Sequence, residues 1–208
     1  MTAFGSAFVV IYAAWGTNDA AAAALVVLAM AAARDRPGWA GVALALAVSY
    51  KAPLALALVP WAVWVVDRGG WAALRRWWSF PATLAATCLP FLLWSPSAMV
   101  GDTVAFWAGA GDTAFPTSGL GLPVHAPGLM EGVAGPVITA ALLVAGLASA
   151  TVVVRRFDHV AVLPVASALV LLGLFIPART FQPNYLGLIT GLLATGWLVA
   201  AGREEPVG

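Results

Sequence analysis

The sequence predicts an all-α, polytopic membrane protein with about 7–8 transmembrane or half-membrane helices. Hydrophobic residues make up 62% of the chain, charged residues make up 9%, and the mean hydropathy is +0.93. Soluble domains typically carry about 25% charged residues. Apolar runs of about 15–22 residues, separated by short charged turns, are typical of membrane helices, and the alternation of an outer-membrane barrel is absent. We expect one transmembrane domain over residues 1–208, without an internal repeat.

Each apolar run predicts one element. In chain order, the runs are a short first segment at 4–15, spans at about 18–33, 80–94, 133–154, 160–176 and 185–201, and a segment at 39–66 that is too long for one straight crossing. Residues 67–78 are predicted to form a polar turn. Residues 95–132 are too polar and too rich in Gly and Pro to cross, so they are predicted to form an outer loop.

Within this loop, Ser95 and Pro96 fit the start of a helix, with Pro at the first helical position. Apolar residues from Met99 to Trp107 then follow at helical spacing, which favours a short interfacial helix. A loop anchored by Phe106 and Trp107 fits the same pattern equally well. The following stretch, GAGDTAFPTSGLGLPVHAPG, has no helix or strand period and is predicted to be an irregular, mobile loop on the substrate side.

The segment at 39–66 is interrupted by Lys51-Ala52-Pro53. Pro53 lacks a backbone donor and disfavours helix at Ala52, so a break is predicted just beyond Lys51. If the segment forms a hairpin, nearly all of the arginines lie on one side, which the positive-inside rule makes cytoplasmic. These are Arg34, Arg36, Arg68, Arg75, Arg76, Arg155, Arg156 and Arg203. A single tilted span would divide them, so we predict a hairpin in a multi-pass protein of the plasma (inner) membrane.

Two ionisable residues, Asp19 and Lys51, lie in sequence that is otherwise apolar. A charge at the middle of a bilayer costs roughly 2.5–3.5 kcal/mol, so such residues usually face a partner, a cavity or a ligand. About 22 Å of helix leads from Asp19 to the charged turn at residue 34, and about 18 Å leads back to Lys51. Both residues are therefore expected near the same, outer face. A structural ion pair, or a lysine that extends to the headgroups, is the alternative.

The same orientation predicts a larger polar set on the outer face. It comprises Asn18, Asp19, Lys51, Asp102, Asp112, His125, Glu131, Arg179, Gln182, Asn184 and Tyr185. Arg179 lies between two prolines at an outer turn, where a headgroup contact and an anion site explain it equally well. No carboxylates or histidines have the spacing of metal ligands, so no metal site or cofactor is predicted. The formal charge of +1 argues against a nucleic-acid partner.

Three stretches together carry a family resemblance. They are GTNDAAAAALVVLAMAAA, RDRPGWAGVALALAVSYKAPLALALVPW and the late FQPNYLG. The sequence resembles the polyprenol-phosphate-sugar-dependent membrane glycosyltransferases of the GT-C superfamily, and most of all the bacterial mannosyltransferases that use polyprenyl-phosphate-mannose. Those enzymes have a Gly-x-Asn-Asp at the outer start of a span and a Lys-x-Pro before a later apolar run. The likeness is good from Gly16 to Trp61 and loose beyond.

The resemblance implies a sugar transfer, most simply of mannose, from a polyprenyl-phosphate donor to a glycan or lipid-linked acceptor on the outer face. Lys51 would contact the lipid phosphate, with Arg179 as a further candidate. Asn18, Gln182, Asn184 and Tyr185 would border the sugar or the acceptor, and a carboxylate would act as the general base.

The sequence departs from the superfamily at the catalytic acidic residue. That residue generally lies in the first outer loop, and we expect this chain to start beyond such a loop. Asp19 is the substitute candidate within the chain, and a missing N-terminal portion or a partner chain is the other possibility. Two alternative functions remain: a permease or flippase-like transporter of an anionic or lipid-linked substrate, which the broken helix favours, and a non-catalytic membrane subunit in which Asp19 and Lys51 simply pair.

Overall fold

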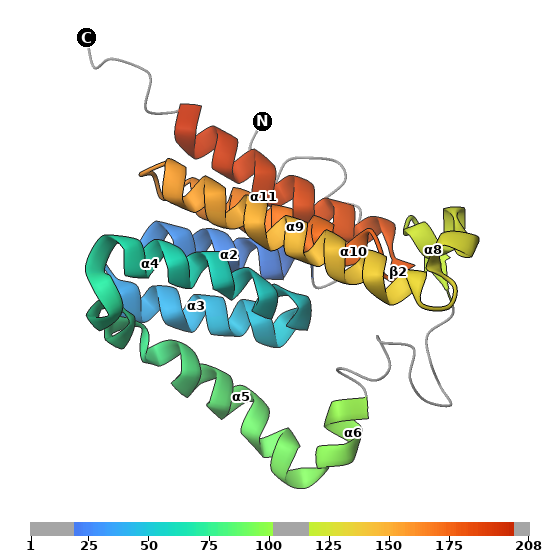
Figure 1. Cartoon of the computed structure of the whole chain (residues 1–208). Helices are drawn as coiled ribbons and strands as arrows, with labels where there is room; N and C mark the ends of the chain where they lie inside the picture. The colour runs from blue at the N-terminus through green and yellow to red at the C-terminus, as the bar shows by residue number, and fades with distance from the viewer. Residues whose placement is uncertain (1–18, 102–116, 202–208) are drawn as a thin grey trace.

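The computed structural model describes residues 19–101 and 117–201, and this part of the chain is all-α with one pair of two-residue strands (Figure 1). The first half contains α2 (Asp19–Ala32), α3 (Pro37–Tyr50), the 3-10 helix η2 (Ala52–Ala57), α4 (Leu58–Ala73), η3 (Leu74–Trp77), α5 (Ser79–Trp94) and α6 (Pro96–Val100). The second half contains β1 (Ser118–Gly119), α8 (Leu122–His125), η5 (Pro127–Met130), α9 (Ala134–Arg156), α10 (Val162–Phe175), β2 (Thr180–Phe181) and α11 (Pro183–Ala201).

Three helical segments in the described residues are long and apolar enough to cross a membrane: Ala52–Trp77, Ala134–Arg156 and Pro183–Ala201. Four shorter apolar helices accompany them, namely α2, α3, α5 and α10. The outer face of α9 exposes apolar side chains, including Val137 at 60% and Val144 at 63%, as expected of a surface that meets lipid. These features indicate a helical membrane protein. The number of 7–8 spans remains a prediction.

The core is built around α10, in which most residues are buried. This helix packs on α9 and α11 and also on α2, η2 and α4, so it joins the two halves of the chain (Figure 1). Glycines allow α9 and α10 to approach each other closely. A Cβ atom added to Gly173 of α10 would lie 2.5 Å from the carbonyl oxygen of Leu142 and 3.2 Å from the Cα of Gly146, both in α9. Small residues at such crossings let two backbones pack directly, which is the usual way membrane helices associate.

The predicted break at Lys51 is present. Helix α3 ends at Tyr50, Lys51 has extended backbone angles (φ −143°, ψ 86°), and the six residues from Ala52 form a 3-10 helix that contains Pro53. The chain then reverses, so that α4 runs opposite to α3 (Figure 1). Contacts agree with this reversal, because Arg34, ahead of α3, and Arg68, in α4, both bond to Asp158. The hairpin prediction is therefore preferred over a single tilted span.

Four of the arginines that the sequence predicted on one side lie together at one end of the bundle, namely Arg34, Arg68, Arg76 and Arg155. Arg68 Nε lies 2.7 Å from Asp158 Oδ1, and its guanidinium also donates to the carbonyl oxygens of Val154 and Phe157. Arg155 Nε lies 3.2 Å from Asp67 Oδ2. Arg203 lies outside the described residues. The direction in which this arginine end faces across a membrane remains a prediction from the positive-inside rule.

Two local predictions were wrong. Residues 67–78 are largely helical, because α4 continues to Ala73 and η3 follows, while Gly70, at φ 66°, provides the bend that we had read as a turn. Part of the predicted irregular loop is also structured: β1 pairs in parallel with β2, and α8 and η5 follow. The short helix α6 begins at Pro96 as expected, whereas Asp102, Phe106, Trp107 and Asp112 lie outside the described residues, as do residues 1–18.

Candidate functional site

An ion pair joins the start of α2 to the end of α3. Because the two helices form an antiparallel pair, Asp19, the first residue of α2, lies beside Lys51, which follows α3. The Lys51 Nζ atom is 2.7 Å from Asp19 Oδ1, and the two side chains are 13% and 4% exposed. A carboxylate at a helix N-terminus and an ammonium at a helix C-terminus each interact favourably with the local helix dipole charge.

Helix α11 completes the surroundings of this pair with Asn184 and Tyr185. The Asn184 Nδ2 atom donates a hydrogen bond to Asp19 Oδ2, so both carboxylate oxygens have partners. The Lys51 ammonium lies 4.4 Å from the centre of the Tyr185 ring, in a cation–π contact. The structure thus brings together four of the predicted site residues, from the beginning, the middle and the end of the described chain.

The Tyr185 ring belongs to a stack of three aromatic rings. The Tyr185 ring lies 4.4 Å from the ring of Phe175 at an interplanar angle of 19°, and Phe175 lies 5.8 Å from Phe181 at 24°. Phe175 and Phe181 are both buried. Neither was predicted as part of the site. Their spacing along the chain gave no helical or strand period, because they lie on either side of the turn between α10 and α11.

Arg179 and Gln182 hold the preceding loop in place. Gln182 Nε2 donates to Ser118 Oγ at 3.1 Å, and Arg179 Nε donates to Thr117 Oγ1 at 3.3 Å. The backbone adds the bonds from Ser118 N to Arg179 O and from Leu120 N to Phe181 O. These hydrogen bonds hold residues 117–120 against β2 and its neighbouring residues. The roles predicted for Arg179 in phosphate binding and for Gln182 in substrate binding therefore remain predictions, and Asn18 lies outside the described residues.

The arrangement controls the position of the Lys51 ammonium. Asp19 forms an ion pair with Lys51 and accepts a hydrogen bond from Asn184, and the residue is only 3% exposed, so its carboxylate is placed to hold a cation rather than to meet solvent. Lys51 lies at the end of a helix where the backbone is already broken. At membrane depth, such irregular backbone occurs where it is buried in protein or lines a polar cavity. Among the described residues, no three His, Cys, Asp or Glu side chains gather in a way that could hold a metal ion.

Comparisons with family models, with curated proteins and with solved structures find no match for this chain. The interpretation of the site consequently depends on its geometry, and the resemblance of residues 16–61 to GT-C enzymes remains a prediction. The geometry by itself defines a class: a helical membrane protein with a buried ion pair at a helix break, enclosed by an amide and an aromatic ring.

Proposed function

We propose that the chain supplies the phosphate-binding part of a GT-C-type membrane glycosyltransferase. In this proposal the donor is a sugar, most simply mannose, linked to a polyprenyl phosphate, and the acceptor is a glycan or a lipid-linked hydroxyl compound. The observation that carries the proposal is the placement of Lys51, the only lysine in the sequence, at a helix break beside Asp19 and Tyr185. The motif that contains Lys51 is also the one that carries the family resemblance.

The chemistry of Lys51 suits a phosphate. An ammonium group carries three hydrogen-bond donors, so it can keep its contact with Asp19 and also reach a phosphate oxygen. Because the surroundings are mostly apolar, the attraction between the two charges is screened less than it would be in water. The Asp19 and Tyr185 contacts hold the ammonium in one place before the donor arrives, which reduces the cost of ordering it on binding.

In the proposed reaction, the acceptor hydroxyl oxygen bonds to the anomeric carbon of the sugar, and the bond from that carbon to the phosphate oxygen breaks. The lipid phosphate leaves with the electron pair, and Lys51 stabilises its charge. The hydroxyl proton passes to a carboxylate base. Because both oxygens of Asp19 are engaged, its geometry supports a positioning role for Lys51, and we place the base on a carboxylate outside the described residues.

The location follows from the same orientation argument. We place the protein in the plasma (inner) membrane with the arginine end in the cytoplasm, so that the Lys51 end faces outward. This arrangement supports transfer on the outer face, where a lipid-linked donor and a cell-envelope acceptor would meet. Labelling of single cysteines introduced near Arg36 and near Leu129, with a membrane-impermeant reagent on intact cells, tests it. Labelling at the Arg36 end alone would contradict the orientation.

The function is tested by measuring transfer of labelled mannose from polyprenyl-phosphate-mannose in membranes that contain the full-length protein. We expect Lys51→Gln to reduce transfer at least 100-fold when transfer is normalised to the amount of folded protein in the membranes. The matched control is Arg36→Gln, which removes one positive charge at the other end of the same helix and should leave transfer within twofold. Equal transfer by wild type and Lys51→Gln would refute the proposal.

A second candidate, a purely structural ion pair in a non-catalytic subunit, is favoured by one observation: Asp19 is buried and both of its oxygens are occupied. The double variant Asp19→Asn/Lys51→Met separates the two ideas, since it removes both charges together. A structural pair predicts that this variant accumulates normally and keeps the biological activity of the wild type. The glycosyltransferase proposal predicts normal accumulation with no transfer.

A further inference from the structure

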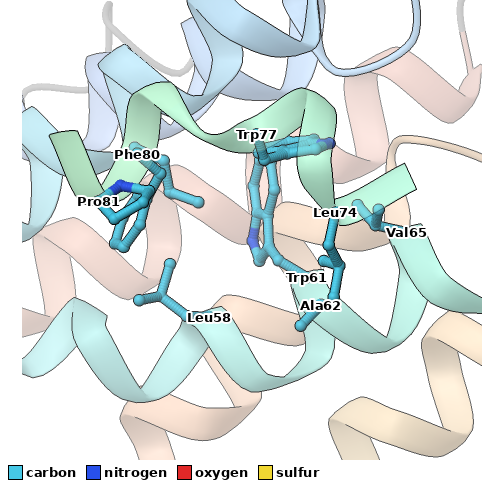
Figure 2. Close-up of a pocket in the computed structure, with 9 residues that line it drawn as sticks. Leu58, Trp61, Ala62, Val65, Leu74, Trp77, Phe80 and Pro81 are labelled. Carbon is cyan, nitrogen blue, oxygen red and sulfur yellow. The ribbon is translucent and has the colours of Figure 1, made fainter. Parts of the chain in front are cut away.

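An apolar pocket lies between α4 and the start of α5, away from the ion pair (Figure 2). It has a volume of about 200 Å³, and its walls include Leu58, Trp61, Trp77, Phe80 and Pro81. Figure 2 shows these side chains directed into the space between the two segments. The rings of Trp61 and Trp77 meet edge to face, with centroids 6.0 Å apart, which gives one wall a rigid aromatic surface.

A second pocket adjoins the first on the side toward the arginine end of the bundle. Val65 and Trp77 line both pockets, so the two share a wall. The second pocket has a volume of about 510 Å³, and Arg34, Arg68 and Arg76 contribute to its lining. The combined hollow is therefore amphipathic: it is apolar along α4 and α5 and cationic at the end where these helices meet the charged turns.

The charged side chains that line the second pocket form a rim with a net positive charge. The lining holds three arginines and one acidic residue, Asp158, which gives a net charge of +2. Arg68 forms an ion pair with the Asp158 carboxylate, and Arg34 donates to the Asp158 backbone carbonyl oxygen. Arg76 is exposed and makes no hydrogen bond or ion pair with residues 19–101 or 117–201. A rim of this kind complements an anion, and Arg76 is the side chain that is placed to meet it.

We propose that this combined hollow binds an anionic phospholipid, with its phosphate group at the arginine rim and part of an acyl chain in the apolar pocket. Basic pockets at the ends of membrane helices are known binding sites for acidic lipid headgroups. The position of an apolar pocket beside a cationic one is what favours a lipid: a free phosphate would use only the rim, and a docked helix would use only the apolar wall. The site is distinct from the Lys51 site and does not depend on the function proposed for it.

Binding is measured on the purified full-length chain in a non-ionic detergent, by native mass spectrometry with added phosphatidylglycerol or phosphatidylcholine. We expect retention of phosphatidylglycerol in preference to phosphatidylcholine. Arg76→Gln should weaken phosphatidylglycerol binding roughly fivefold, which corresponds to about 1 kcal/mol for one arginine. The matched control is Arg75→Gln, because Arg75 is the exposed neighbour in the same 3-10 helix and does not line the pocket.

A second variant tests the acyl-chain part of the site. Ala62 lines the apolar pocket, so Ala62→Phe should fill it and weaken phosphatidylglycerol binding, whereas Ala72→Phe, on the same helix but outside the pocket, should not. Equal losses in Arg75→Gln and Arg76→Gln would overturn the proposal in favour of diffuse surface charge. Full competition by inorganic phosphate, together with no effect of Ala62→Phe, would overturn it in favour of a soluble anion. Equal binding of phosphatidylcholine would also overturn it.

Discussion

Removing the two charges of the ion pair singly and together should show strong coupling between Asp19 and Lys51. Lys51→Met leaves the Asp19 carboxylate, with a side chain 4% exposed, supported by Asn184 alone. Breaking a buried pair in this way costs about 3–5 kcal/mol. Asp19→Asn should cost less, about 1–3 kcal/mol, because Lys51 is 13% exposed and keeps its contact with the Tyr185 ring.

The free energy of unfolding of the double variant Asp19→Asn/Lys51→Met should fall by only about 0–2 kcal/mol. Asn at position 19 can still accept a hydrogen bond from Asn184, and Met replaces the apolar part of the lysine side chain. The coupling energy is then at least about 2 kcal/mol. Equilibrium unfolding in mixed non-ionic detergent and SDS micelles, followed by the fluorescence of the 10 tryptophans, measures it. Additivity of the single variants to within about 0.5 kcal/mol would refute the reasoning.

Four further variants test the packing of the bundle in the same unfolding assay. Gly173→Ala should lower the free energy of unfolding by about 1–3 kcal/mol because its Cβ would meet backbone atoms of α9. Gly191→Ala has open space at its Cβ, so it should leave the free energy of unfolding unchanged or raise it by up to about 1 kcal/mol. Equal effects of the two substitutions would contradict the close-packing argument. Ser167→Ala should lose about 1–3 kcal/mol, since the buried Nε1 of Trp61 donates to Ser167 Oγ at 3.0 Å; an unchanged free energy of unfolding would show that this bond contributes nothing. Arg68→Lys should lose about 1.5–3 kcal/mol because an ammonium cannot reproduce the several bonds of the guanidinium, and full stability of this variant would contradict that account.

The helices could be predicted from the sequence because hydrophobic run length directly reflects bilayer thickness. The predicted spans at 18–33, 80–94 and 133–154 lie within a few residues of α2, α5 and α9. The helix break at Lys51 was also predictable, since the physical cause, Pro53, is local. The placement of Asp19 and Lys51 at the same end of their helices followed from counting helix rise along two antiparallel segments, whereas their ion pair was the alternative interpretation.

The parts that could not be predicted depend on contacts between distant residues. Nothing local to Ser118 indicates a strand, since β1 is only two residues long and exists through its pairing with β2. The link from Asn184 to Asp19 likewise requires knowledge of which helices are neighbours. The helical content of residues 67–78 was not predicted because charged residues suggest a turn, although arginines can also lie on a helix that emerges from an apolar layer. The helix is interrupted at Gly70, whose backbone angles are not helical, and this interruption redirects the chain.

The energetics of the ion pair also bear on why Lys51 is worth testing as a ligand-binding group. A buried ion pair can be replaced by apolar residues at little or no cost in stability, because removing two charges from water offsets much of their attraction. If the double variant is as stable as we expect, the pair contributes little to the free energy of folding that Asn and Met do not supply. What those residues cannot supply is a fixed positive charge at a helix break, 4.4 Å from an aromatic ring and partly accessible. Such a charge is suited to binding an anion, and the phosphate of a lipid, which lies next to an apolar chain, is the commonest anion at a membrane site.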